Sequence, residues 1–83
     1  MTILLYKNKD ALKNIGGLMD HVDIHIGKLN RFPPPDPNRD KWRKEIRAAI
    51  DKARKWTNRM SPGMRQDMMN RLINAAEAAV PQD

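Results

Sequence analysis

Two histidines and a lysine share one short segment of the sequence. His21, His25 and Lys28 are separated by four and then three residues. At helical spacing the three side chains lie on one face, because residues three and four apart are neighbours on a helix surface. In an extended strand, His21 and His25 would still share a face, together with Asp23 between them. Since imidazole changes its protonation state near neutral pH, this pair is the chain's best candidate for acid–base work.

Two kinds of chemistry fit this segment. In a metal-independent ribonuclease, His21 and His25 would be the general base and general acid, and Lys28 would stabilise the charge on the phosphate. In a metal-dependent nuclease, the histidines would bind a divalent ion together with Asp20 or Asp23. The segment lacks the glutamate of the zinc metalloprotease motif. The alternative without chemistry is that both histidines are ordinary polar residues on a helix surface.

The segment that carries the histidines is predicted to be a helix. Its apolar residues are spaced by 4, 4 and 3 positions: Leu18, Val22, Ile26 and Leu29. That stripe is typical of an amphipathic helix. The stretch 22–26 also alternates as a strand would, but helix is the preferred interpretation over 18–30. Before it, we expect a short helix that ends at Gly16-Gly17, and an apolar run at 3–6 that is a strand or a first helical turn.

Two further helices are predicted in the second half of the chain. Apolar residues spaced by 4, 3, 4, 3 and 4 positions mark a helix over 39–60: Trp42, Ile46, Ala49, Ala53, Trp56 and Met60. A second helix over 61–80 begins with Ser61 as a good N-cap and Pro62 at the first helical position. Because the joint between them is short, the two helices are expected to pack as an antiparallel hairpin. Four prolines within 32–38 predict a stiff connector before the hairpin.

Length and composition limit the architecture. At 83 residues and 9.6 kDa the chain is expected to form one mainly α domain, 1–83. Its parts are an N-terminal segment at 1–30, the connector at 31–38 and the hairpin at 39–80. Because cysteine is absent, disulfides and thiolate zinc sites are excluded. No apolar run is long enough to span a bilayer, and the run at 3–5 is too short for a signal peptide, so the expected site of action is cytoplasmic.

The positive charge is concentrated on one predicted helix. The chain carries a formal net charge of +6 and a pI of about 10.1. Without Arg39 at its start, the helix over 39–60 holds eight basic and three acidic residues, which gives a local net charge of +5. Such a surface attracts phosphate backbones and also acidic proteins, and we rank membrane binding below both. The side chains expected to bind nucleic acid are Arg43, Lys44, Arg47, Arg54 and Lys55.

The order of these features resembles C-terminal effector modules of bacterial polymorphic toxins, of the Rhs-repeat and contact-dependent-inhibition type. The resemblance covers about residues 15–60. It rests on Gly-Gly-Leu, His21-x-x-x-His25, Lys28-Leu29, a proline-rich spacer and Trp42-Arg-Lys-Glu-Ile46. Such modules are commonly nucleases, each neutralised by an immunity protein that is often acidic. The resemblance implies a site formed by His21, His25, Lys28, Trp42 and Glu45. Many toxin nucleases contain a mixed sheet, from which this mainly helical chain departs.

The sequence therefore predicts a small toxin-like nuclease that acts on RNA or DNA, with a divalent metal as its candidate cofactor. One alternative is a non-catalytic nucleic-acid-binding or regulatory module, of the kind that phages encode. Another is a protein-interaction module in which Trp42, Trp56 and Met60 contact a partner helix. A chain of this size also commonly forms a homodimer to complete its core.

Overall fold

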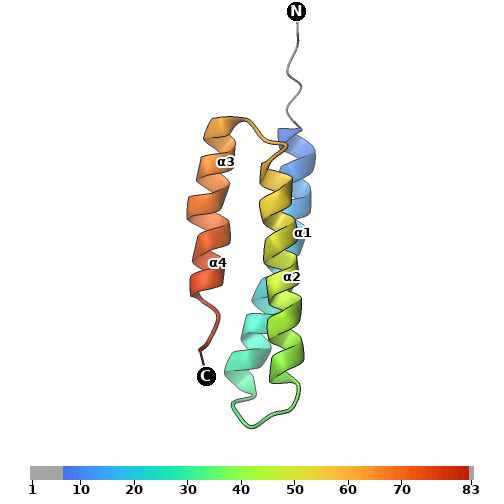
Figure 1. The fold of residues 1–83 in the computed structure, drawn as a ribbon, viewed down its shortest axis with the longest axis vertical. Helices are drawn as coiled ribbons and strands as arrows, with labels where there is room; N and C mark the ends of the chain where they lie inside the picture. The colour runs from blue at the N-terminus through green and yellow to red at the C-terminus, as the bar shows by residue number, and fades with distance from the viewer. Residues whose placement is uncertain (1–6, 83) are drawn as a thin grey trace, which may run out of the picture.

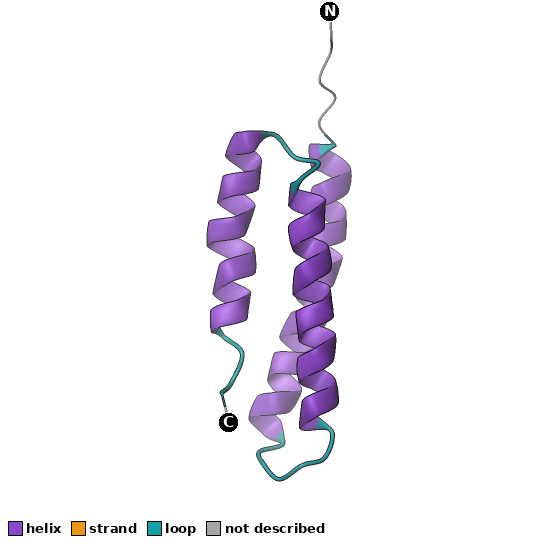
Figure 2. Cartoon of the chain, in the orientation of Figure 1, coloured by secondary structure: helices purple, strands orange, loops and turns teal. Residues whose placement is uncertain are grey.

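The computed structural model describes residues 7–82, and this part of the chain consists of helices and the turns between them. The elements are α1 (Asn8–Arg31), α2 (Arg39–Thr57), α3 (Pro62–Met68), the π-helical turn η1 (Met69–Ile73) and α4 (Asn74–Ala78). Helices α1 and α2 form a long antiparallel hairpin, and α3, η1 and α4 run back along it as one continuous segment (Figures 1 and 2). The mainly α prediction is confirmed, and the apolar run at 3–6 lies outside the described residues.

Helix α1 continues through the two glycines that were expected to end it. Gly16 and Gly17 both lie inside the 24-residue helix, so the predicted stop is wrong. Each glycine costs a helix interior about 1 kcal/mol relative to alanine. Burial of the neighbouring apolar residues outweighs that cost, since Ile15 and Val22 are fully buried and Met19 is nearly so. The prediction of helix rather than strand over 18–30 is confirmed.

The proline-rich connector reverses the chain between α1 and α2, and one arginine holds the reversal in place. The guanidinium of Arg39 is buried, with 5% of the residue exposed. It donates hydrogen bonds of 2.6 Å to the carbonyl oxygens of both Leu29 and Phe32. Those carbonyls belong to the end of α1, where backbone acceptors lack partners within the helix. Arg39 therefore joins the last turn of α1 to the first residue of α2.

The core lies mainly between α1 and α2. The buried apolar residues are Ala11, Ile15, Met19, Val22, Leu29, Ile46, Ala49, Ile50, Ala53, Met60 and Ile73. On α2 they follow the predicted stripe, with Ile50 added to it. Trp42 and Trp56 are half-buried and pack against the edge of this core. Among the described helices, none combines the length and the apolar character needed to cross a membrane.

The C-terminal hairpin is also confirmed, although α2 ends at Thr57 and a turn precedes α3. Ser61 occupies the N-cap position and Pro62 the first turn of α3, as predicted. Ser61 bonds to the start of α1: its backbone N–H donates 2.9 Å to Asn8 Oδ1, and Asn8 Nδ2 donates 3.3 Å to Ser61 Oγ. This contact ties the beginning of α1 to the α2–α3 turn.

Candidate functional site

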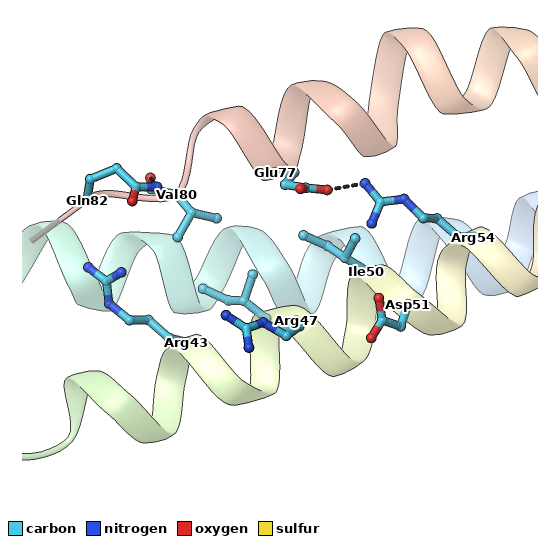
Figure 3. Close-up of a pocket in the computed structure, with 9 residues that line it drawn as sticks. Arg43, Arg47, Ile50, Asp51, Arg54, Glu77, Val80 and Gln82 are labelled. Carbon is cyan, nitrogen blue, oxygen red and sulfur yellow. Dashed lines mark hydrogen bonds and ion pairs between the residues drawn. The ribbon is translucent and has the colours of Figure 1, made fainter.

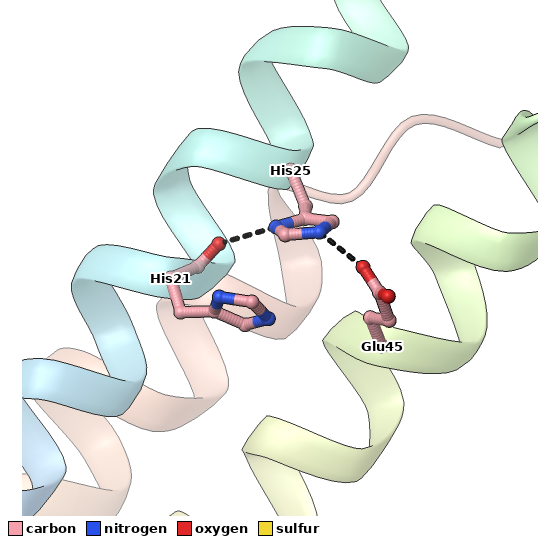
Figure 4. Close-up of side chains that lie close together, drawn as sticks. All are labelled: His21, His25 and Glu45. Atoms are coloured by element: carbon pink, nitrogen blue, oxygen red, sulfur yellow. Dashed lines mark hydrogen bonds and ion pairs between the residues drawn. The ribbon is translucent and has the colours of Figure 1, made fainter.

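Two histidines of α1 and one glutamate of α2 come together at the interface of the long hairpin (Figure 4). His21 and His25 are one helical turn apart, and their ring centroids are 4.1 Å apart. His25 stands within the buried stripe of α1, so it faces α2, where Glu45 meets it. The potential ligand atoms of the three side chains all lie within 4.8 Å of one another. The structure thus joins Glu45 to the predicted histidine pair.

Both ring nitrogens of His25 have partners. Nδ1 lies 2.9 Å from the backbone carbonyl oxygen of His21, and Nε2 contacts the Glu45 carboxylate. A carbonyl oxygen only accepts hydrogen bonds, so Nδ1 must carry a proton and donate it. Only 5% of His25 is exposed. Because neither nitrogen faces solvent, His25 is suited to orient Glu45 rather than to exchange protons with a substrate.

The accessible part of the cluster is formed by His21 and Glu45. His21 is exposed, and 38% of the Glu45 side chain is accessible. Both line a hollow of about 350 Å³ at the surface between α1 and α2, together with Leu18, Ala48, Ala49 and Lys52. An imidazole, a carboxylate and an ammonium group therefore border one site. Such a set can transfer protons to and from a bound phosphate ester, or hold a cation between imidazole and carboxylate.

Four residues of the predicted site lie elsewhere. Asp20 and Asp23 are exposed and point about 140–160° away from His25 around the axis of α1. The Lys28 ammonium lies 5.8 Å from the centroid of the Trp42 ring, and neither Lys28 nor Trp42 lines the hollow. Sequence reasoning missed Lys52, although it follows Glu45 by seven residues, two turns along the same face of α2.

The arginines of the predicted phosphate-binding set lie on the opposite side of α2 from Glu45. Arg43, Arg47 and Arg54 are about 160–200° from it around the helix axis. They line a cavity of about 240 Å³ between α2 and the C-terminal segment (Figure 3). Arg43 donates a hydrogen bond of 2.6 Å to the carbonyl of Pro81, and Arg54 forms an ion pair with Glu77. Two of the three arginines therefore hold the C-terminal segment.

The lysines of α2 lie on the same side as Glu45. Lys41, Lys44, Lys52 and Lys55 all fall within about 100° of it around the axis. With Arg59, which follows α2, they form what we call the basic row. All five side chains are exposed, and no ion pair joins them to a carboxylate within residues 7–82. The guanidinium of Arg59 lies 4.5 Å from the Trp56 ring centroid, and a second hollow of about 200 Å³ is lined by Lys52, Lys55, Trp56 and Arg59. Because Lys52 also lines the hollow of His21 and Glu45, the row leads directly to the cluster.

The residues expected to contact a partner helix belong to the core and its edge. Met60 is buried, with 3% exposed. Trp42 and Trp56 are half-buried, and the Trp42 ring also packs against Phe32 with centroids 5.8 Å apart. These contacts show that the stripe of α2 faces the chain's own helices.

Similarity to known proteins was sought at the level of families, sequences and folds. No family model, no curated protein and no solved structure matches the chain. The relation to toxin effector modules therefore stays a prediction from the residues that suggested it.

Proposed function

We propose that this protein binds nucleic acid through the basic row. The observation that carries the proposal is the division of charge on α2. Three of its arginines contact the chain's own backbone or carboxylates, whereas its four lysines stay exposed without a carboxylate partner in the described residues. From Lys41 to Lys55 the row extends for about 21 Å along the helix, enough to follow several successive phosphates. Release of the counterions condensed on those phosphates would drive binding.

An aromatic ring next to the row favours single-stranded nucleic acid. Trp56 is half-buried and lines the same hollow as Lys52 and Lys55. Base stacking on an aromatic side chain is available to an unpaired base and adds to the attraction between cations and phosphates. We therefore expect a single strand to bind with its backbone along the lysines and a base near Trp56.

The test is a salt titration of binding to a fluorescently labelled single-stranded oligonucleotide, followed by anisotropy. Five phosphate contacts predict that log K falls against log salt with a slope of about −3.5. In the double variant Lys52→Gln/Lys55→Gln the slope should fall in magnitude to about −2. The matched control is Arg47→Gln/Arg65→Gln, which removes the same charge from exposed side chains outside the row. Equal losses in the two variants would show that net charge, rather than the row, determines binding.

A second candidate function is cleavage of the bound strand. It is favoured by the position of Lys52, which borders both the basic row and the hollow of His21 and Glu45. A phosphate held by Lys52 would come within reach of an imidazole and a carboxylate, the groups that nuclease chemistry requires. The assay incubates labelled RNA and plasmid DNA with the protein, with its His21→Ala/Glu45→Gln variant, and with EDTA. This candidate would be eliminated if the wild-type protein cleaves neither substrate, or if the variant cleaves as fast as the wild type.

The basic row also fits an acidic protein partner. If the chain is a toxin module, an immunity protein rich in Asp and Glu would cover the same cations and compete with nucleic acid. The competition would be lost in Lys52→Gln/Lys55→Gln and kept in Arg47→Gln/Arg65→Gln.

A further inference from the structure

We propose that His21, His25 and Glu45 form a binding site for a divalent transition-metal ion, of which Zn²⁺ is the probe to use. The three side chains come from two helices and converge with their potential ligand atoms within 4.8 Å of one another (Figure 4). Two imidazoles and one carboxylate are a ligand set that binds zinc in proteins, usually with a fourth position left open. Metal binding is separate from nucleic-acid binding, and only its use in cleavage rests on the second candidate function above.

The hydrogen bonds of His25 carry the argument. Its Nδ1 donates to the carbonyl oxygen of His21 at 2.9 Å, which leaves the lone pair of a neutral ring on Nε2. That lone pair points at the Glu45 carboxylate, which is also an acceptor. Two acceptors face each other stably only with a proton or a cation between them. A metal ion at this position would bind both, and a backbone carbonyl on the other ring nitrogen is how proteins commonly orient a metal-binding histidine.

His21 supplies the third ligand, and its freedom makes the geometry attainable. In a tetrahedral zinc site with bonds of about 2.0–2.2 Å, ligand atoms lie about 3.3 Å apart. His21 is exposed and one turn from His25, so its ring can rotate toward the ion without disturbing the core. The Glu45 side chain is 38% accessible, so its carboxylate can move away from His25 Nε2 and let the ion lie between them. The structure therefore needs only a side-chain adjustment to close the site.

The surroundings leave room for a fourth ligand. The hollow that His21 and Glu45 line is about 350 Å³, is open to solvent and is also lined by Lys52. A water or a phosphate oxygen would complete the coordination there. Because two of the three protein ligands are imidazoles, the site favours zinc-like ions over Ca²⁺ or Mg²⁺, which prefer oxygen ligands.

The experiment measures Zn²⁺ binding to the full chain, free of any histidine tag, by isothermal titration calorimetry. Co²⁺ is then added as a spectroscopic probe of a low-coordinate site. We expect one equivalent of Zn²⁺ and a visible Co²⁺ absorption band. His21→Ala and Glu45→Gln should each lower the affinity at least tenfold while the circular-dichroism spectrum of the helices is unchanged. Both positions are accessible, so these variants avoid the buried His25.

The matched control is Asp23→Asn, an exposed carboxylate of α1 that lies away from the cluster. It should bind Zn²⁺ like the wild type. Absence of binding in molar excess of Zn²⁺, or binding that His21→Ala and Glu45→Gln leave unchanged, would overturn the proposal. His21→Ala leaves the charge of the basic row unchanged, so its nucleic-acid affinity in the presence of EDTA should stay at the wild-type value. Glu45→Gln removes a negative charge beside Lys52 and should not weaken nucleic-acid binding. This separates a failed metal site from failed nucleic-acid binding.

Discussion

Replacing both Gly16 and Gly17 by alanine should stabilise the protein. The two glycines lie inside α1, and an added Cβ would meet no atom within 4 Å at either position. Alanine in a helix interior is favoured over glycine by about 0.8–1 kcal/mol per residue, so the double variant should gain about 1.5–2 kcal/mol. For a domain of this size that corresponds to a rise in Tm of about 10 °C.

The assay is thermal unfolding followed by circular dichroism, with urea unfolding as a second measure of the free energy. The control is Ala48→Gly, at an exposed position of α2, which should lower stability by about 1 kcal/mol by the same mechanism. The continuous helix would be refuted if the Tm of the double variant is unchanged or lower while Ala48→Gly lowers stability as expected. It would mean that the glycines end a helix, as the sequence alone indicates.

Three further substitutions probe the fold, each by urea unfolding. Ile15→Ala should lower the free energy of unfolding by about 2–5 kcal/mol, because Ile15 is fully buried and truncating its side chain leaves a cavity. Arg39→Gln should lower the free energy of unfolding by about 2–3 kcal/mol, since it removes charge-assisted hydrogen bonds to two carbonyl oxygens at the end of α1. An unchanged free energy of unfolding would contradict the role of Arg39 in joining α1 to α2. Glu77→Gln should change the free energy of unfolding by less than about 1 kcal/mol, because its ion pair with Arg54 is partly exposed, and high salt should erase the difference.

Most helices of this protein follow from local signals in the sequence. Apolar spacing predicts helix over 18–30, 39–60 and 61–80, and the Ser61-Pro62 pair marks the start of α3. The same spacing places His21 and His25 on one face. These features depend on residues within one or two turns of each other, which is the range over which periodicity and capping act.

The tertiary structure decided the path of α1 through its glycines and the membership of the site. Local signals favoured a stop at Gly16-Gly17, but burial of α1 along α2 outweighs the cost of two glycines. The carboxylate beside the histidines is Glu45, twenty residues after His25, which the resemblance to toxin modules implied, and not one of the adjacent aspartates that local spacing offered. The lysines of α2 flank the site, whereas Arg43 and Arg54 hold the C-terminal segment. Such pairings depend on which faces meet when distant helices bury their apolar stripes, and this information is not present in the spacing of any single helix.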